Sequence, residues 1–112
     1  MSNSLANSND PAQVGNGIYG DYAVCEGPEP YYWGGTWMCA ADGTDNLPFI
    51  KDLMYRLTCD EKTMKQITLD TQDYTNNEAA MDEIAQSDYS SDFLGGQNHI
   101  ALFAEAAKKI DM

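Results

Sequence analysis

PFIKDLMYRLTCDEKTMKQI, residues 48–67, carries two helical patterns in succession. In the first pattern, apolar side chains recur at three- and four-residue intervals, which places them on one face of a helix. They are Phe49, Ile50, Leu53, Met54 and Leu57. Pro48 fits the first turn, where its missing N–H is not needed. We therefore expect a helix here with a buried apolar stripe.

Capping residues mark the starts of three further helices. Thr58 and Glu61 have the spacing of a capping box, in which each side chain accepts a hydrogen bond from the backbone of the other residue. The same spacing recurs at residues 75–78 and predicts a helix from there to about Gln86. Asn98 is placed to cap a last helix. The apolar stripe of that helix would consist of Ile100, Phe103, Ala107 and Ile110.

The part of the chain before these helices predicts β-structure. Residues 19–25 and 35–41 contain aromatic and β-branched side chains typical of strands, and a proline-containing break at 26–30 separates them. Turn-forming residues at 42–46 end the second strand. The prediction is an α+β fold, with two strands or a short β-hairpin followed by about four helices. Two strands are too few for a stable sheet, so we expect its other strands in chain that is absent here.

Length and composition favour one globular domain. The chain has 112 residues, of which 43% are hydrophobic, enough for a modest core. Residues 1–17 are polar and predict a flexible tail, which leaves 18–112 as the domain. A net charge of −12 repels phosphate backbones and anionic lipid, so we expect no nucleic-acid partner. The sequence contains neither an apolar run that could span a bilayer nor the start of a signal peptide.

Residues suited to catalysis or metal binding are sparse. Cys25, Cys39 and Cys59 form no CxxC pair, and the single histidine, His99, adds too few ligands for a zinc site. We expect three buried free thiols, with a Cys25–Cys39 disulfide as the alternative. His99 follows a cap, where we expect it to be solvated or to take part in capping. The sequence therefore predicts no catalytic residue, no metal and no cofactor.

The segment YYWGGTW, residues 31–37, concentrates four aromatic rings beside two glycines. Aromatic faces suit the C–H faces of sugar rings, and Gly34 and Gly35 let the backbone approach a ligand closely. Trp33 directly precedes the glycines, so we expect it to be an exposed stacking ring. Trp37 lies inside the second predicted strand, where we expect it to be core. The competing interpretation is that alternation along a strand buries about half of these rings.

The order and spacing of several segments resemble the extracellular solute-binding proteins of carbohydrate ABC importers. The resemblance begins with PYYWGGTWMCAADGTDN, residues 30–46, and continues through the amphipathic helix and helix corner at 49–61. It extends to residues 75–77 and to SDFLGGQN at 91–98, which precedes an alanine-rich helix. In all, the similarity covers residues 19–112.

This resemblance implies the C-terminal segment of a two-lobed, periplasmic-binding-protein-like α/β fold that closes on a sugar or oligosaccharide. It implies an extracellular, cell-surface lipoprotein that is not an enzyme. The implied partners are an ABC transporter permease and an N-terminal lobe that is missing from this chain. The implied ligand-binding residues are Tyr31, Tyr32, Trp33, Gly34, Gly35, Asn76, Asn77 and Gln97. Family members are several times longer and carry an export signal, so we expect a truncated piece.

Two other interpretations use the same residues differently. A free-standing sugar-binding or adhesion module would present the aromatic segment 31–37 on an open surface. A small hydrolase would use carboxylates such as Asp42 and Asp45, but the spacing at 42–46 matches neither an EF-hand loop nor a known catalytic arrangement. The hydrolase is the least favoured of the three.

Overall fold

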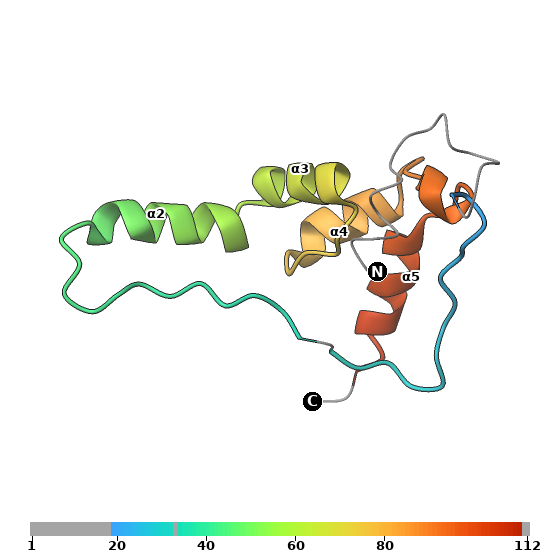
Figure 1. Ribbon diagram of the computed structural model, residues 1–112, viewed down its shortest axis with the longest axis horizontal. Coiled ribbons are helices and arrows are strands. Elements are labelled where there is room, and N and C mark those ends of the chain that lie inside the picture. Colours follow the sequence, from blue (N-terminus) through green and yellow to red (C-terminus); the bar gives the residue numbers. More distant parts are fainter. Residues whose placement is uncertain (1–18, 33, 111–112) are drawn as a thin grey trace.

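A computed structural model describes residues 19–32 and 34–110 and is mainly helical (Figure 1). Its α-helices are α2 (Leu47–Thr58), α3 (Glu61–Thr71), α4 (Glu78–Ala85) and α5 (His99–Ala107), with a 3₁₀ turn, η2 (Asp92–Leu94), before α5. The described part contains no β-strand, and its one isolated β-bridge joins Ser91 to Gln97. The predicted α+β fold with two strands or a β-hairpin is therefore wrong. The expected tail at 1–17 lies outside the described residues.

The two segments predicted as strands run in different parts of the molecule. Residues 19–25 lie near η2 and α5, whereas residues 35–41 run toward α2 (Figure 1). Gly34 and Gly35, where the second predicted strand would begin, have φ values of 64° and 135°, in the region that glycine tolerates best. A strand needs a neighbour to pair its backbone groups, and neither segment has one among the described residues.

The start of α3 differs from the predicted capping box. Asp60 caps this helix, because its Oδ2 accepts a hydrogen bond from the backbone N–H of Thr63 at 2.9 Å. Thr58 is instead the last residue of α2, and its hydroxyl donates to the carbonyl of Met54 at 2.6 Å. An aspartate is a stronger helix cap than a threonine, and here it stands two residues closer to Thr63.

Asparagine side chains cap the two helices that follow. Asn77 caps α4 through its Oδ1, which accepts from Ala80 N at 2.9 Å, so this helix starts two residues later than a Thr75 cap would place it. Asn98 caps α5 as predicted, accepting from Ala101 N at 3.1 Å. Both caps satisfy backbone N–H groups that have no partner within the helix.

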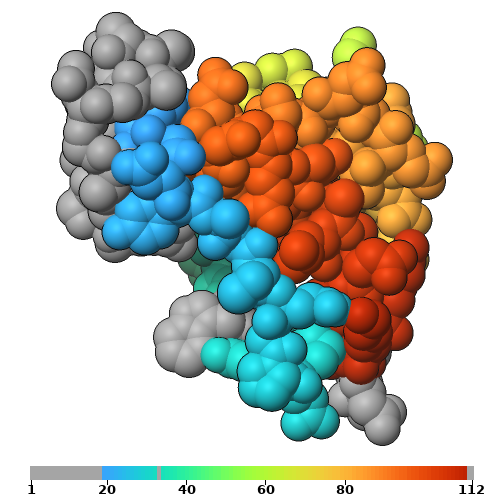
Figure 2. All heavy atoms as spheres, turned by 90° about the vertical axis from the view of Figure 1, so that its right-hand side faces the viewer, coloured from blue at the N-terminus to red at the C-terminus, as the bar shows by residue number. Residues whose placement is uncertain are grey.

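The main core lies where α3, α4 and α5 meet. Its buried members are Met64, Ala80, Met81, Ile84 and Ile100. A smaller cluster of Tyr19, Phe93 and Leu94 attaches the start of the described chain to η2. The core therefore belongs to the C-terminal half, and residues 19–32 lie along its surface (Figure 2).

The helix α2 contributes nothing to this core, although its sequence predicted a buried stripe. None of its residues is buried, and Phe49 on the apolar face is 68% exposed. Trp37, expected in the core, is 91% exposed. Figure 1 shows α2 at one end of the molecule, away from α4 and α5. The amphipathic pattern is correct, but the apolar face is only partly covered, since Ile50, Met54 and Leu57 are half-buried while Phe49 and Leu53 are exposed.

The three cysteines are free but exposed, so the expectation that they are buried is wrong. Cys25 and Cys39 lie on extended segments, and Cys59 lies at the corner between α2 and α3, away from the core. None of the helices among residues 19–32 and 34–110 is both long and apolar enough to cross a membrane.

Alanine substitution of one core residue and of one exposed aromatic residue tests which side chains belong to the core. Ile84→Ala is expected to lower the free energy of unfolding by about 2–5 kcal/mol, because it leaves a cavity in the core. Trp37→Ala is expected to change it by less than about 0.5 kcal/mol, because the ring packs against little. Urea unfolding followed by far-UV circular dichroism measures both. Equal losses for the two variants would place Trp37 in the core after all.

Candidate functional site

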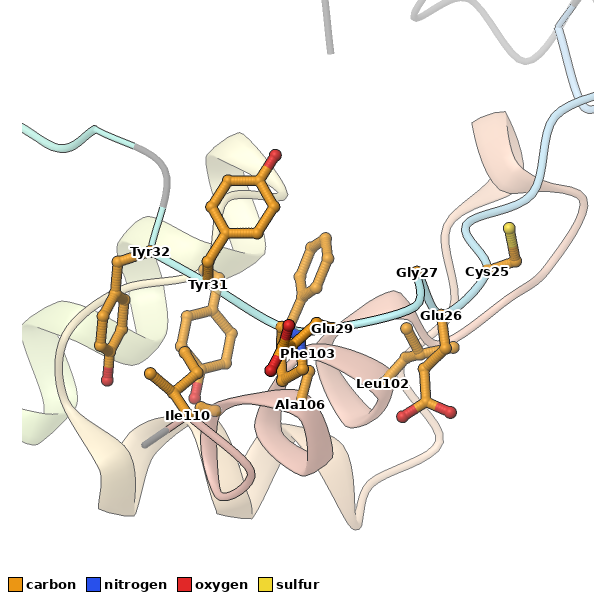
Figure 3. A pocket seen from close by; sticks show the side chains of 13 residues that line it. Cys25, Glu26, Gly27, Glu29, Tyr31, Tyr32, Leu102, Phe103, Ala106 and Ile110 are labelled. Atoms are coloured by element: carbon orange, nitrogen blue, oxygen red, sulfur yellow. The ribbon is translucent and has the colours of Figure 1, made fainter. Parts of the chain in front are cut away.

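An open groove of about 540 Å³ lies between residues 25–32 and α5 (Figure 3). Its walls are mainly apolar and aromatic. They include the rings of Tyr31, Tyr32, Tyr74 and Phe103, with Leu102 and Ile110. In Figure 3 the rings of Tyr31 and Tyr32 point to opposite sides of the extended segment, as neighbouring side chains do in extended backbone. We call this hollow the aromatic groove.

A second hollow, of about 440 Å³, adjoins the aromatic groove and shares Tyr32 and Tyr74 with it. Its lining is more polar and includes Asn76, Glu78 and Asp82. Tyr74 is positioned by Phe103, against which its ring packs edge to face at 6.0 Å between centroids. The two hollows together form one surface in which an aromatic part leads into a polar part.

One side chain holds the extended segment against the C-terminal half. The side-chain amide of Gln97 accepts a hydrogen bond from Val24 N at 2.8 Å and donates one to Val24 O at 2.7 Å. Figure 2 shows the blue and cyan segment, residues 19–32, running along the orange and red C-terminal part. The Gln97–Val24 pair therefore fixes one wall of the aromatic groove relative to α5.

Further contacts support this wall on both sides of Val24. Gly20 N donates to Phe93 O at 3.0 Å, and the ring of Tyr22 stacks on Phe93 with 6.1 Å between centroids. Beyond Val24, Lys109 forms an ion pair with Glu26 at 2.5 Å. The bond to Glu26 raises the pKa of Lys109, which keeps its ammonium charged. The wall is thus held by a few polar contacts at separate points.

Only some of the predicted ligand-binding residues line a hollow in the structure. Tyr31 and Tyr32 line the aromatic groove, and Asn76 lines the second hollow. Asn77 caps α4 and Gln97 binds Val24, so both side chains have structural partners. Gly34 and Gly35 line neither hollow. Trp33 lies outside the described residues.

Sequence reasoning missed Tyr74 and Phe103, which complete the aromatic lining. Phe103 stands on the apolar stripe predicted for the last helix, which was not singled out as a ligand site. Its ring is 36% exposed. Tyr74 precedes the residues that start α4 and carried no periodic signal, so no local pattern could have found it.

Tyr74 is one of the two tyrosines at the junction of the two hollows. Burial raises the pKa of its phenol, and the carboxylates of Asp82 and Glu78 raise it further. The phenol therefore stays protonated at neutral pH and can both donate and accept a hydrogen bond.

His99 supports the groove from behind. It is buried, and its Nε2 lies 2.7 Å from the carbonyl oxygen of Gln72, so the expectation of a solvated or capping side chain is wrong. The ring also packs edge to face on Phe103 at 5.7 Å. His99 thereby orients Phe103 and joins the start of α5 to the end of α3. No three His, Cys, Asp or Glu side chains gather as a metal site in the described ranges.

Gln97→Ala tests the attachment of the groove wall. The loss of two partly buried hydrogen bonds is expected to lower the free energy of unfolding by about 1–3 kcal/mol. Amide exchange at Val24 should accelerate, because this N–H loses its acceptor. Gln66→Ala is the control, since its side chain bonds only the exposed Asp70 within α3. Unchanged exchange at Val24 would mean that other contacts hold the wall.

Asn76 lines the second hollow, whereas its neighbour Asn77 caps α4, so alanine substitutions at the two positions should affect stability differently. Asn77→Ala is expected to cost about 1 kcal/mol of stability, because the first turn of α4 loses its acceptor. Asn76→Ala should leave stability unchanged, since its exposed side chain borders the second hollow. Thermal unfolding of the two variants measures the difference. A larger loss for Asn76→Ala would contradict the assignment.

Comparison with known proteins adds no relative to this chain: no protein family, no curated protein and no solved structure matches it. The chemistry of the aromatic groove is therefore the structural ground for a functional proposal.

Proposed function

We propose that this chain is a carbohydrate-binding segment of an extracellular solute-binding protein that serves an ABC importer. The observation that carries the proposal is the aromatic groove, where tyrosine rings are exposed beside hydrogen-bonding groups. Tyr31 is 70% exposed and Tyr32 is 66% exposed, although both belong to the lining of a concave surface. Exposed aromatic rings in a hollow are typical of a ligand site.

The lining supplies both kinds of contact that a sugar requires. The flat faces of Tyr32 and Tyr74 suit the C–H faces of a pyranose ring. The side chains of Asn76, Glu78 and Asp82 can accept or donate hydrogen bonds to hydroxyl groups in the adjoining hollow. Such contacts hold a neutral ring by stacking and orient it by hydrogen bonds, with no covalent step. The proposed activity is therefore binding.

The exposed face of α2 supports the proposal that this chain works as part of a larger lobe. Its apolar side chains, among them Phe49 and Leu53, lie in solvent on an amphipathic helix. Further chain of the same lobe would cover this face, a companion lobe would close over the sugar, and a membrane permease would receive the ligand. The same proposal places the protein at the cell surface as a lipoprotein.

A free-standing sugar-binding module is the second candidate. It is favoured by the exposure of Tyr31 and Tyr32, whose rings are open to solvent in the lining of the aromatic groove. The two candidates differ in affinity. A site that shares its contacts with a second lobe binds weakly when that lobe is absent, whereas a free-standing module retains its full affinity.

Titration of the chain with neutral mono- and oligosaccharides tests the proposal. The expected Kd is about 1 mM or weaker, which corresponds to about 4 kcal/mol of binding free energy. Tyr32→Ala should weaken binding about fivefold, because stacking on one ring contributes about 1 kcal/mol. Tyr55→Ala is the matched control, since Tyr55 is 59% exposed on α2 and outside both hollows.

The measurement is isothermal calorimetry together with chemical-shift mapping of the labelled chain. Shifts should concentrate on Tyr31, Tyr32 and Tyr74. Micromolar affinity would support the free-standing module over the segment of a larger protein. If none of the sugars shifts these residues, the groove is not a carbohydrate site and the proposed function is wrong.

A further inference from the structure

The two hollows carry an excess of negative charge. Their linings contain four carboxylates, those of Glu26, Glu29, Glu78 and Asp82. Two lysines at the end of α5 offset part of this charge, since Lys109 pairs with Glu26 and Lys108 with Asp82 at 3.4 Å. Within residues 19–32 and 34–110, Glu29 and Glu78 form no ion pair. Each hollow thus retains one carboxylate without a cation.

These carboxylates stand beside aromatic rings. Glu29 lines the aromatic groove with Tyr31 and Phe103, and Glu78 lines the second hollow with Tyr74. A protonated amine gains from both groups, because it forms charge-assisted hydrogen bonds with a carboxylate and is attracted to the face of an aromatic ring. A neutral hydroxyl gains less from either.

The net charge of the whole chain also favours a cationic ligand over an anionic one. Its net charge of −12 attracts cations and repels anions before contact, and the repulsion is strongest in a concave site lined with acids. An acidic sugar would also place its own carboxylate beside Glu29 or Glu78. The groove therefore disfavours uronic acids by its charge even where their ring shape fits.

We infer that the groove selects a sugar that carries a protonated amine over neutral and acidic sugars of the same shape. This inference rests on the proposed function, because it takes the aromatic groove as the sugar site. It goes further by naming the chemical class of the ligand. In the bound state the amine lies between Glu29 or Glu78 and the neighbouring ring, and the remaining hydroxyls bind the other polar side chains.

Three disaccharides of one size test the inference. They are the β-linked dimer of glucosamine, its fully N-acetylated counterpart and the β-linked dimer of glucuronate, each titrated into the full chain at a pH where the sugar amine is protonated and carboxylates are ionised. The expected order of affinity is amine, then acetylated, then acidic, with roughly two- to fivefold between steps, as for exposed charge pairs. Raising the salt concentration should narrow the differences.

Matched variants separate the groove from the general charge of the chain. Glu29→Gln and Glu78→Gln should each reduce the preference for the amine over the acetylated sugar. Glu61→Gln removes the same charge from an exposed position on α3, outside both hollows, and should leave the preference unchanged. Chemical shifts of Tyr31 and Tyr74 report whether the sugar occupies the groove in each case.

The outcomes distinguish this inference from the proposed function. Equal affinity for the amine and acetylated sugars, or an equal effect of Glu61→Gln and Glu29→Gln, would overturn the amine preference and leave sugar binding intact. Binding of putrescine, a linear diamine, as tight as that of the glucosamine dimer would show that charge alone is recognised, which overturns both. If none of the three sugars shifts the groove residues, the proposed function fails.

Discussion

The packing of α5 on α4 is the contact on which the rest of the described chain depends. Ile84 and Ile100 are buried between these helices, at 1% and 0% exposure. Asn98 reinforces the contact, because its Oδ1 caps α5 while its Nδ2 donates to the carbonyls of Ile84 and Ala85 at the end of α4. One residue thus caps the start of α5 and links it to the end of α4. The aromatic groove exists because α5 is held in this place.

The extended wall of the groove is attached more weakly than its helical wall. Residues 19–32 contact the helical half through the cluster at Phe93, the Gln97–Val24 pair and the Lys109–Glu26 ion pair. A segment with few buried apolar contacts opens at a lower free energy than a core helix. A ligand that bridges the two walls would therefore also order this segment, and part of its binding free energy would be spent on that ordering.

Helices could be predicted from the sequence because their signals are local. The periodicity at 49–57 and the cap at Asn98 depend on residues within two turns of each other, and both were correct in position. The cap of α3 was misplaced because Thr58 and Asp60 are both competent caps, and only the structure shows which one bends out of the helix. The prediction of strands failed because a strand needs a pairing partner that can lie far away in the sequence. The described residues contain no such partner strand.

The same limit explains the partial prediction of the site. Tyr31 and Tyr32 were found from a local concentration of rings, whereas Tyr74 joins them across more than forty positions of sequence. Burial of Trp37 was inferred from a strand that did not form, so its exposure follows from the same missing pairing. Contacts between residues far apart in the chain cannot be predicted from a short stretch of sequence.

The bare apolar face of α2 also affects how copies of this chain behave toward one another. At low ionic strength the net charge of −12 keeps molecules apart and hinders contact between these faces. At about 0.1 M salt, charges separated by more than about 10 Å are largely screened, so the repulsion between molecules weakens. Phe49 and Leu53 can then meet their counterparts in another copy. Salt, which keeps many proteins in solution, would drive this one toward self-association and precipitation.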